Sequence, residues 1–191
     1  EAVTTPTFGW YAPPELNAQK MINGHVWITY YRAWQQTGDL ALVDALAGDL
    51  NEKGLNVSCF FAYSLREPEA QEELLRKAEA EPPDVVLTMQ SFSIGGLDER
   101  VSFLDTLGCP VLQVVASMEN RKAWLENPRG LSPSNVAMSV ALPETDGRIL
   151  TTVAGFKETE ERFEELEFQT KAMVPDPDQV RYVSELALNW I

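Results

Sequence analysis

The chain has little of what most metal, redox and nucleic-acid sites require. One histidine and two cysteines among 191 residues exclude a multi-histidine metal site and a disulfide framework made by this chain alone. Only 15 lysine and arginine residues stand against 29 aspartate and glutamate residues, and the formal net charge of -14 argues against a nucleic-acid partner. The low cysteine count is typical of a reducing compartment, so we expect a cytoplasmic protein.

The sequence also lacks a targeting segment and a membrane span. No basic region followed by an apolar one opens the chain, and no run reaches the roughly 18 apolar residues that a membrane helix needs. The first residue is Glu1 rather than methionine, so we expect a processed product or an excised internal piece. The motifs GxGxxG, GxxxxGK[ST], CxxC, HExxH and GxSxG are missing, which leaves no standard nucleotide, zinc or nucleophile signature.

What is present is an alternation of two kinds of segment. Apolar residues make up 45% of the chain, enough for a core. Continuously apolar runs, typical of strands covered on both faces, predict strands at 25–31, 56–63, 84–90 and 109–116. Segments of helical periodicity lie between them, so we expect βαβ crossovers. The predicted fold class is therefore α/β, a parallel sheet with helices on both faces, of flavodoxin-like or Rossmann-like shape.

Helix signals complete this outline. Asp39 is the expected cap of a helix that Gly54 stops, and Pro68 lies in the first turn of the next one. Further helices are predicted at 99–107, 119–126, 158–169 and 178–191.

The pattern loosens after residue 127. Residues 136–142 form another apolar run, and Asp146-Gly147 is a turn signal, so the sequence predicts a hairpin over 136–156. We expect three parts, a lead-in segment 1–23, an α/β domain 24–157 and a helical extension 158–191 that leads to a further domain.

Candidate functional residues gather where the predicted strands end. Ligands of parallel α/β sheets bind beyond the carboxyl ends of the strands. The aromatic and polar residues there are typical of a small-molecule cleft, although loops of α/β proteins carry such residues in any case. They are Tyr30 to Trp34, Tyr63, Gln90 to Phe92 and Ser117 to Asn120.

Three other features have a functional and a structural interpretation. The loop 91–96 either cradles an anion or is a plain connection. Glu144 and Asp146 are either proton acceptors or cation ligands, or they belong to a solvated turn. His25 is a metal ligand, a proton carrier or a structural histidine, whereas Cys59 and Cys109 are expected in the core.

The run from Cys109 to Glu158 resembles the CobN and magnesium-chelatase H family, the large subunits of metal chelatases. The resemblance covers about 24–157 and rests on an ordered series of elements rather than on one tripeptide. These elements are Ile28 to Arg32, Asp84 to Val86, Ser91 to Ser93, Pro110 to Gln113, Trp124, Gly130 to Pro133 and Leu142 to Gly147. Asn127 to Gly130, Asp146 to Arg148 and Phe156-Lys157 look closer to the cobalt branch.

This resemblance implies insertion of a metal ion into a tetrapyrrole, a corrin precursor or a porphyrin. Cobalt, or magnesium, is then a substrate, ATP is used by separate AAA+ partner subunits, and this piece binds no cofactor and is inactive alone. Glu144 is implied as a base or metal ligand, with Asp146 second. The implied substrate-binding residues are Tyr30, Arg32, Ser91, Trp124, Arg129 and Arg148. A non-catalytic flavodoxin-like sensor or scaffold domain is the alternative, and a stand-alone small-molecule enzyme is a third possibility.

Overall fold

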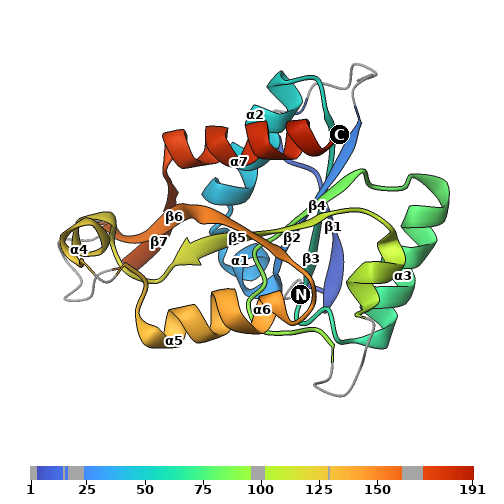
Figure 1. Cartoon of the computed structure of the whole chain (residues 1–191). Coiled ribbons are helices and arrows are strands. Elements are labelled where there is room, and N and C mark those ends of the chain that lie inside the picture. Colours follow the sequence, from blue (N-terminus) through green and yellow to red (C-terminus); the bar gives the residue numbers. More distant parts are fainter. Residues whose placement is uncertain (1–3, 15, 17–23, 96–101, 129, 161–169) are drawn as a thin grey trace.

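Seven strands form one mixed sheet in the order β1-β3-β2-β4-β5-β6-β7 (Figure 1). The computed structural model describes residues 4–14, 16, 24–95, 102–128, 130–160 and 170–191. The strands are β1 Phe8–Tyr11, β2 His25–Tyr31, β3 Asn56–Ala62, β4 Val85–Thr88, β5 Val111–Ser117, β6 Ile149–Glu160 and β7 Thr170–Pro175. The five central strands are parallel, and only the edge strands β1 and β7 run antiparallel to their neighbours.

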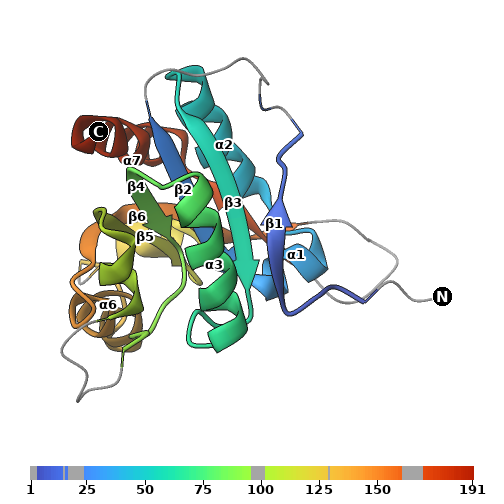
Figure 2. The same ribbon diagram turned by 90° about the vertical axis from the view of Figure 1, so that its right-hand side faces the viewer.

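The parallel arrangement predicted for the first four strands is confirmed. The expectation of a purely parallel sheet is wrong at the two edges, where β1 and β7 pair antiparallel. Figure 2 shows β1 beside β3 at one edge, so a strand that begins at Phe8 joins the sheet from the predicted lead-in. The central order β3-β2-β4-β5-β6 corresponds to the 2-1-3-4-5 order of flavodoxin-like sheets. The finer fold assignment stays a prediction.

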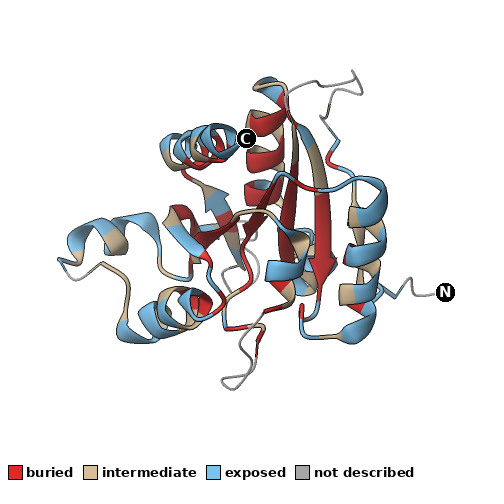
Figure 3. Cartoon of the chain, turned by 45° about the vertical axis from the view of Figure 1, so that its right-hand side comes forward, coloured by how far each residue is buried: buried red, intermediate tan, exposed pale blue. Residues whose placement is uncertain are grey.

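Helices pack on both faces of the sheet. The helical elements are α1 Arg32–Thr37, α2 Ala41–Glu52, α3 Pro68–Ala80, a 3-10 helix Phe103–Leu107, α4 Arg121–Glu126, α5 Pro133–Val136, a π-helical turn Ala137–Ala141, α6 Leu142–Glu144 and α7 Pro177–Trp190. Side chains alternate along β2, so that Val26 and Ile28 pack with α2 and α7 whereas Trp27 packs with α3 and the 3-10 helix. The central strands are accordingly buried (Figure 3).

The predicted hairpin over 136–156 is wrong. Residues 133–144 form one continuous helical segment instead, which Ser132 caps by accepting a hydrogen bond from the Asn135 N–H at 3.3 Å. A short apolar run fits a strand and a buried helix equally well, and here the Ser-Pro pair at the helix start decides for the helix. The helix ends at Glu144, and Gly147, at φ 72°, lies in the turn that follows it, where its N–H donates to the Glu144 carbonyl at 3.0 Å.

Two of the predicted helices need correction. The predicted helix 99–107 is a 3-10 helix over Phe103–Leu107, and 99–101 lie outside the described residues. Residues 158–160 extend β6 instead of starting a helix, and 161–169 are again outside the described residues.

Asp39 does not cap α2, because Leu40 occupies that position. The Asp39 carboxylate instead pairs with Lys157 and accepts a hydrogen bond from the Met173 N–H at 2.7 Å, so it joins the entry of α2 to β6 and β7. The amphipathic helix predicted at the end of the chain is confirmed as α7, which packs on α2 and β6. The three-part division of the chain stays a prediction.

Replacement of Gly147 by alanine should destabilise the chain by about 1–2 kcal/mol. The left-handed conformation at φ 72° is costly for a residue with a Cβ, although no atom lies within 4 Å of the position that a Cβ would take. Gly48→Ala is the matched control, because Gly48 lies inside α2 with equally open space, and this change should stabilise by roughly 0.5–1 kcal/mol. Urea unfolding followed by circular dichroism measures both, and an equal effect of the two changes would contradict the left-handed conformation of Gly147 in the turn after α6.

Candidate functional site

A cavity of about 580 Å³ opens at the carboxyl ends of β2, β3 and β4. The strand order reverses between β2 and β4, and ligands of open α/β sheets bind at such a switch point. The volume of the cavity is within the range of small-molecule sites. The lining residues come from the ends of these strands, the start of α1, the loops after β3 and β4, and α6. They are Tyr31, Arg32, Ala33, Tyr63, Ser64, Leu65, Arg66, Gln90, Ser91, Phe92, Ser93, Ile94, Gly95 and Leu142.

Exposed aromatic rings form part of the cavity wall. Tyr63 is 68% exposed and Phe92 is 50% exposed, so both present apolar surface to a ligand. Phe92 has a φ of 66°, the one left-handed non-glycine residue of the described chain, and its N–H donates to the Met138 carbonyl at 2.8 Å. Such strained residues persist where surrounding contacts impose them, often at functional sites.

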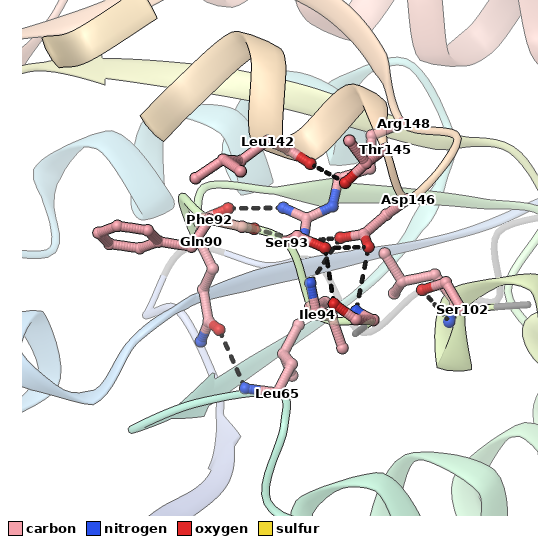
Figure 4. Close-up of polar contacts among 12 residues, drawn as sticks. Leu65, Gln90, Phe92, Ser93, Ile94, Ser102, Leu142, Thr145, Asp146 and Arg148 are labelled. Carbon is pink, nitrogen blue, oxygen red and sulfur yellow. Dashed lines mark hydrogen bonds and ion pairs between the residues drawn. The ribbon is translucent and has the colours of Figure 1, made fainter. Parts of the chain in front are cut away.

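A buried carboxylate organises the loop after β4. Asp146, only 5% exposed, accepts hydrogen bonds from the Ser93 hydroxyl at 2.7 Å, the Ile94 N–H at 2.7 Å and the Gly95 N–H at 3.0 Å (Figure 4). It also pairs with Arg148 at 2.7 Å. The donors of this loop thus bind the side chain of Asp146, and the interpretation of the loop 91–96 as a cradle for an anionic ligand stays a prediction.

Arg148 completes the network from the start of β6. Its Nη1 donates to the Gln90 carbonyl at 2.8 Å and to the Gln113 side-chain oxygen at 2.9 Å. Its Nη2 donates to the Phe92 carbonyl at 2.9 Å as well as to Asp146, and only its Nε–H lacks a partner among the described residues. One guanidinium therefore fixes the backbone on both sides of Ser91.

Gln90 links the same loop to the two strands on the other side of the cavity. Its side-chain nitrogen donates to the carbonyls of Tyr30 at 3.0 Å and Ala62 at 3.1 Å, and its side-chain oxygen accepts from the Leu65 N–H at 3.2 Å. The ends of β2 and β3 are thereby tied to the end of β4. Buried polar groups satisfied in this way make a rigid scaffold for the cavity.

The ionisation of the Asp146 carboxyl follows from its partners. Burial raises its pKa, but the hydrogen bonds from Ile94, Ser93 and Gly95 and the charge of Arg148 outweigh burial, so the pKa of Asp146 lies below its ordinary value. Burial lowers the pKa of Arg148, whereas the negative charge of Asp146 and its hydrogen bond act in the opposite direction. Arginine side chains stay protonated in proteins at neutral pH, and the lowered pKa of Asp146 keeps its carboxyl charged, so the pair is ionised.

The substrate-binding residues implied by the resemblance fall into different places. Ser91 and Arg32 line the cavity, and the Ser91 N–H donates to the Tyr31 hydroxyl at 2.8 Å. Tyr30 is fully buried on the opposite side of the strand, where its hydroxyl donates to Gln35 at 2.7 Å. Trp124 packs in a separate cluster with Val115, Val153, Phe156 and Leu131. Arg129 lies outside the described residues.

The predicted catalytic pair is divided by the structure. Glu144 is exposed at the end of α6 and does not line the cavity, whereas Asp146 is buried in the network. The contacts of Asp146 and Arg148 are those of residues that position the loop. The roles in proton transfer, metal binding and substrate binding proposed for Glu144, Asp146 and Arg148 stay predictions.

The sequence analysis assigned no individual role to two residues that hold the loop after β4 in place. Arg66 donates from Nε to the Ser93 carbonyl at 2.9 Å and lines the cavity from the loop after β3. The side-chain oxygen of Gln113, inside β5, accepts a hydrogen bond from Arg148. Polar amides inside or at the end of apolar strands were a usable signal for Gln113 and Gln90, because a buried amide needs partners, but nothing marked Arg66.

Two absences concern the part of the chain that the structure describes. No group of three or more His, Cys, Asp and Glu side chains is placed there as a metal site would require. None of the described helices has the length and apolar character needed to cross a bilayer. His25, one of the ambiguous residues, is half-buried and shares a 2.8 Å hydrogen bond with the Ser58 hydroxyl.

Replacement of Asp146 by asparagine should destabilise the chain by about 3 kcal/mol at pH 7, since it leaves a buried guanidinium uncompensated. The folded pKa of Asp146 is depressed, so its stabilisation is present above the unfolded value of about 3.9 and is lost as the pH falls towards the folded value. The difference between wild type and variant should therefore shrink below about pH 4 in urea unfolding curves.

The control for this series is Asp178→Asn, because Asp178 is exposed and pairs with Arg181 at the surface of α7. That change should alter stability by less than about 1 kcal/mol. A constant difference between wild type and Asp146→Asn from pH 7 to pH 3 would show that the carboxylate charge does not hold the loop.

Comparison with known proteins agrees with the family resemblance. The CobN/Magnesium Chelatase family model matches residues 3–191. The aerobic cobaltochelatase subunit CobN of Sinorhizobium sp. is 35% identical over 167 residues, which are 86% of this chain and 13% of that protein. The same subunit of Pseudomonas aeruginosa is 31% identical over 163 residues, 85% of this chain and 13% of that protein.

A solved structure gives the same result for the fold. The catalytic subunit of cobaltochelatase from Mycobacterium tuberculosis superposes with a TM-score of 0.80 at 30% identity, over 97% of this chain and 16% of that chain. The chain thus spans between 13% and 16% of the length of these relatives. Since the family model covers almost every residue and the fold agrees, this chain belongs to the CobN/magnesium chelatase family.

Proposed function

We propose that the chain is part of the tetrapyrrole-binding large subunit of an ATP-dependent metal chelatase that inserts cobalt into a corrin precursor during cobalamin biosynthesis. The observation that carries this proposal is the cavity beyond β2, β3 and β4 in a chain of this family. Its exposed rings, Tyr63 and Phe92, offer flat apolar surface to a macrocycle. The relatives named above are cobaltochelatase subunits, which supports cobalt over magnesium as the metal substrate.

The residues that line the cavity support a division of labour within this proposal. The aromatic wall contacts the ring, and Ser91 and Arg32 contact its polar substituents. Asp146 and Arg148 hold the loop that carries Phe92, so that the wall is formed before the ring arrives and less ordering is needed on binding. ATP is hydrolysed by separate AAA+ subunits in the cytoplasm, and this part of the subunit carries no cofactor of its own.

Glu144 is the group that we propose to assist deprotonation or transfer of the metal ion. It lies at the carboxyl end of the helical segment 133–144, where the helix dipole adds negative charge to that of the carboxylate. A dication is attracted to such a place, and Glu144 is exposed, so the metal ion can bind there before it passes to the ring in the cavity. Tyr30 and Trp124 have no part in this proposal, because both pack away from the cavity.

Replacement of Phe92 by alanine in the full-length subunit should weaken binding of a metal-free corrin by about tenfold, because a ring that stacks on the ligand is lost. Tyr182→Ala is the matched control, since Tyr182 is equally exposed, 50%, but lies on α7. Titration of the ring absorbance measures both affinities. Unchanged affinity in Phe92→Ala would contradict the cavity as the ring site, and a non-catalytic sensor or scaffold would bind no ring at all.

Replacement of Glu144 by glutamine should lower the rate of cobalt insertion by the assembled enzyme roughly a hundredfold, the usual loss for a missing general base. Binding of the ring should stay within twofold of wild type, since Glu144 does not line the cavity. Glu185→Gln, at an exposed carboxylate of α7, serves as the control. A normal insertion rate in Glu144→Gln would show that Glu144 has no role in metal insertion and only ends the helix.

A further inference from the structure

The cavity has a charge that the composition of the chain does not favour. Acidic residues outnumber basic residues by 29 to 15, yet among the described residues that line the cavity there are two arginines, Arg32 and Arg66, and no aspartate or glutamate. The nearest carboxylate of the network, Asp146, lies behind the loop and is neutralised by Arg148. The described lining of the cavity therefore carries positive charge in a negative protein, an arrangement that attracts an anionic group.

The two arginines differ in how far their guanidinium groups are already engaged. Arg32 donates from Nε to the Pro6 carbonyl and from Nη2 to the Thr5 carbonyl, both at 2.5 Å, so it ties the segment before β1 to the end of β2. Arg66 donates from Nε to the Ser93 carbonyl at 2.9 Å, and its Nη2 reaches the Gly95 carbonyl only at 3.5 Å. Neither forms an ion pair with a carboxylate in the described ranges, and Nη1 of Arg66 has no hydrogen-bond partner there.

The position of Arg66 is fixed by the same loop that Asp146 organises. Asp146 binds the N–H groups of that loop, whereas Arg66 binds the carbonyl of Ser93. The backbone N–H of Arg66 is held in turn by the Ser64 hydroxyl at 3.1 Å. The planar guanidinium thus lines the cavity, and one of its edges pairs with no group among the described residues. That edge has the geometry to bind a carboxylate through two hydrogen bonds.

We propose that Arg66 determines substrate specificity by binding a carboxylate on the periphery of the macrocycle, so that the site prefers rings with free carboxylates over the same rings as amides. This inference rests on the proposed function, and it names the substituent chemistry that the cavity selects. Tyr63 and Phe92 contact any ring of the right shape, whereas Arg66 distinguishes an anionic substituent from a neutral one. An amide carries an N–H₂ donor that meets the N–H donors of Arg66 and cannot satisfy them as a carboxylate does.

The test uses the full-length subunit and two probes, a metal-free corrin with free carboxylates and the same corrin with every carboxylate converted to an amide. Wild type should bind the carboxylate form about tenfold more tightly at low salt, the scale of one charge-assisted hydrogen-bonded contact. Arg66→Gln should lose this preference by weakening only the carboxylate form, and Arg66→Lys should restore part of it. Arg76→Gln is the control, because Arg76 is exposed on α3 and pairs with Glu73 outside the cavity.

The two hypotheses fail in different ways. Equal weakening of both corrins in Arg66→Gln would make Arg66 a structural support of the loop and overturn the specificity role. Unchanged affinity for both would overturn it as well, because no carboxylate would then contact Arg66. If wild type bound neither corrin, the proposed function would fall, and the specificity role with it.

Discussion

The buried ion pair between Asp146 and Arg148 is the interaction on which the cavity depends. Two charges withdrawn from water are costly unless nearly every hydrogen-bonding group is matched. Here the carboxylate receives donors from the loop after β4, and the guanidinium donates to the carbonyls of Gln90 and Phe92. The network therefore converts a loop, ordinarily the most variable part of an α/β unit, into a fixed wall.

This constraint explains why an unfavourable backbone conformation persists at Phe92. The residue keeps φ at 66° because Arg148 holds its carbonyl and Met138 accepts from its N–H. Its ring then stands exposed in the cavity wall opposite the end of β3. A group on the far side of the loop thus determines where the ligand-facing side chain points, and Arg66 binds the same loop from the cavity side.

The sequence predicted the scaffold well and the site only in part. Continuous apolar runs identify the parallel strands, because both faces of such strands are buried, and strand ends then place Tyr63, Ser91 and Phe92 at one edge. The apolar run 136–142 was wrongly predicted as a strand, because hydrophobicity over seven residues does not distinguish a strand from a helix. Asp146 and Arg148 were singled out as chemical groups. Their pairing with a loop some 50 residues away depends on tertiary contacts that one sequence does not contain.

The central claim is that the cavity at the ends of β2, β3 and β4 contacts the macrocycle. Hydrogen exchange of the full-length subunit, with and without a metal-free corrin, tests it most directly because it maps contact without altering any residue. The account predicts slower amide exchange in 64–66 and 91–95 on ring binding, and unchanged exchange in α7 Pro177–Trp190. Protection elsewhere in the subunit, with both cavity segments unchanged, would contradict it.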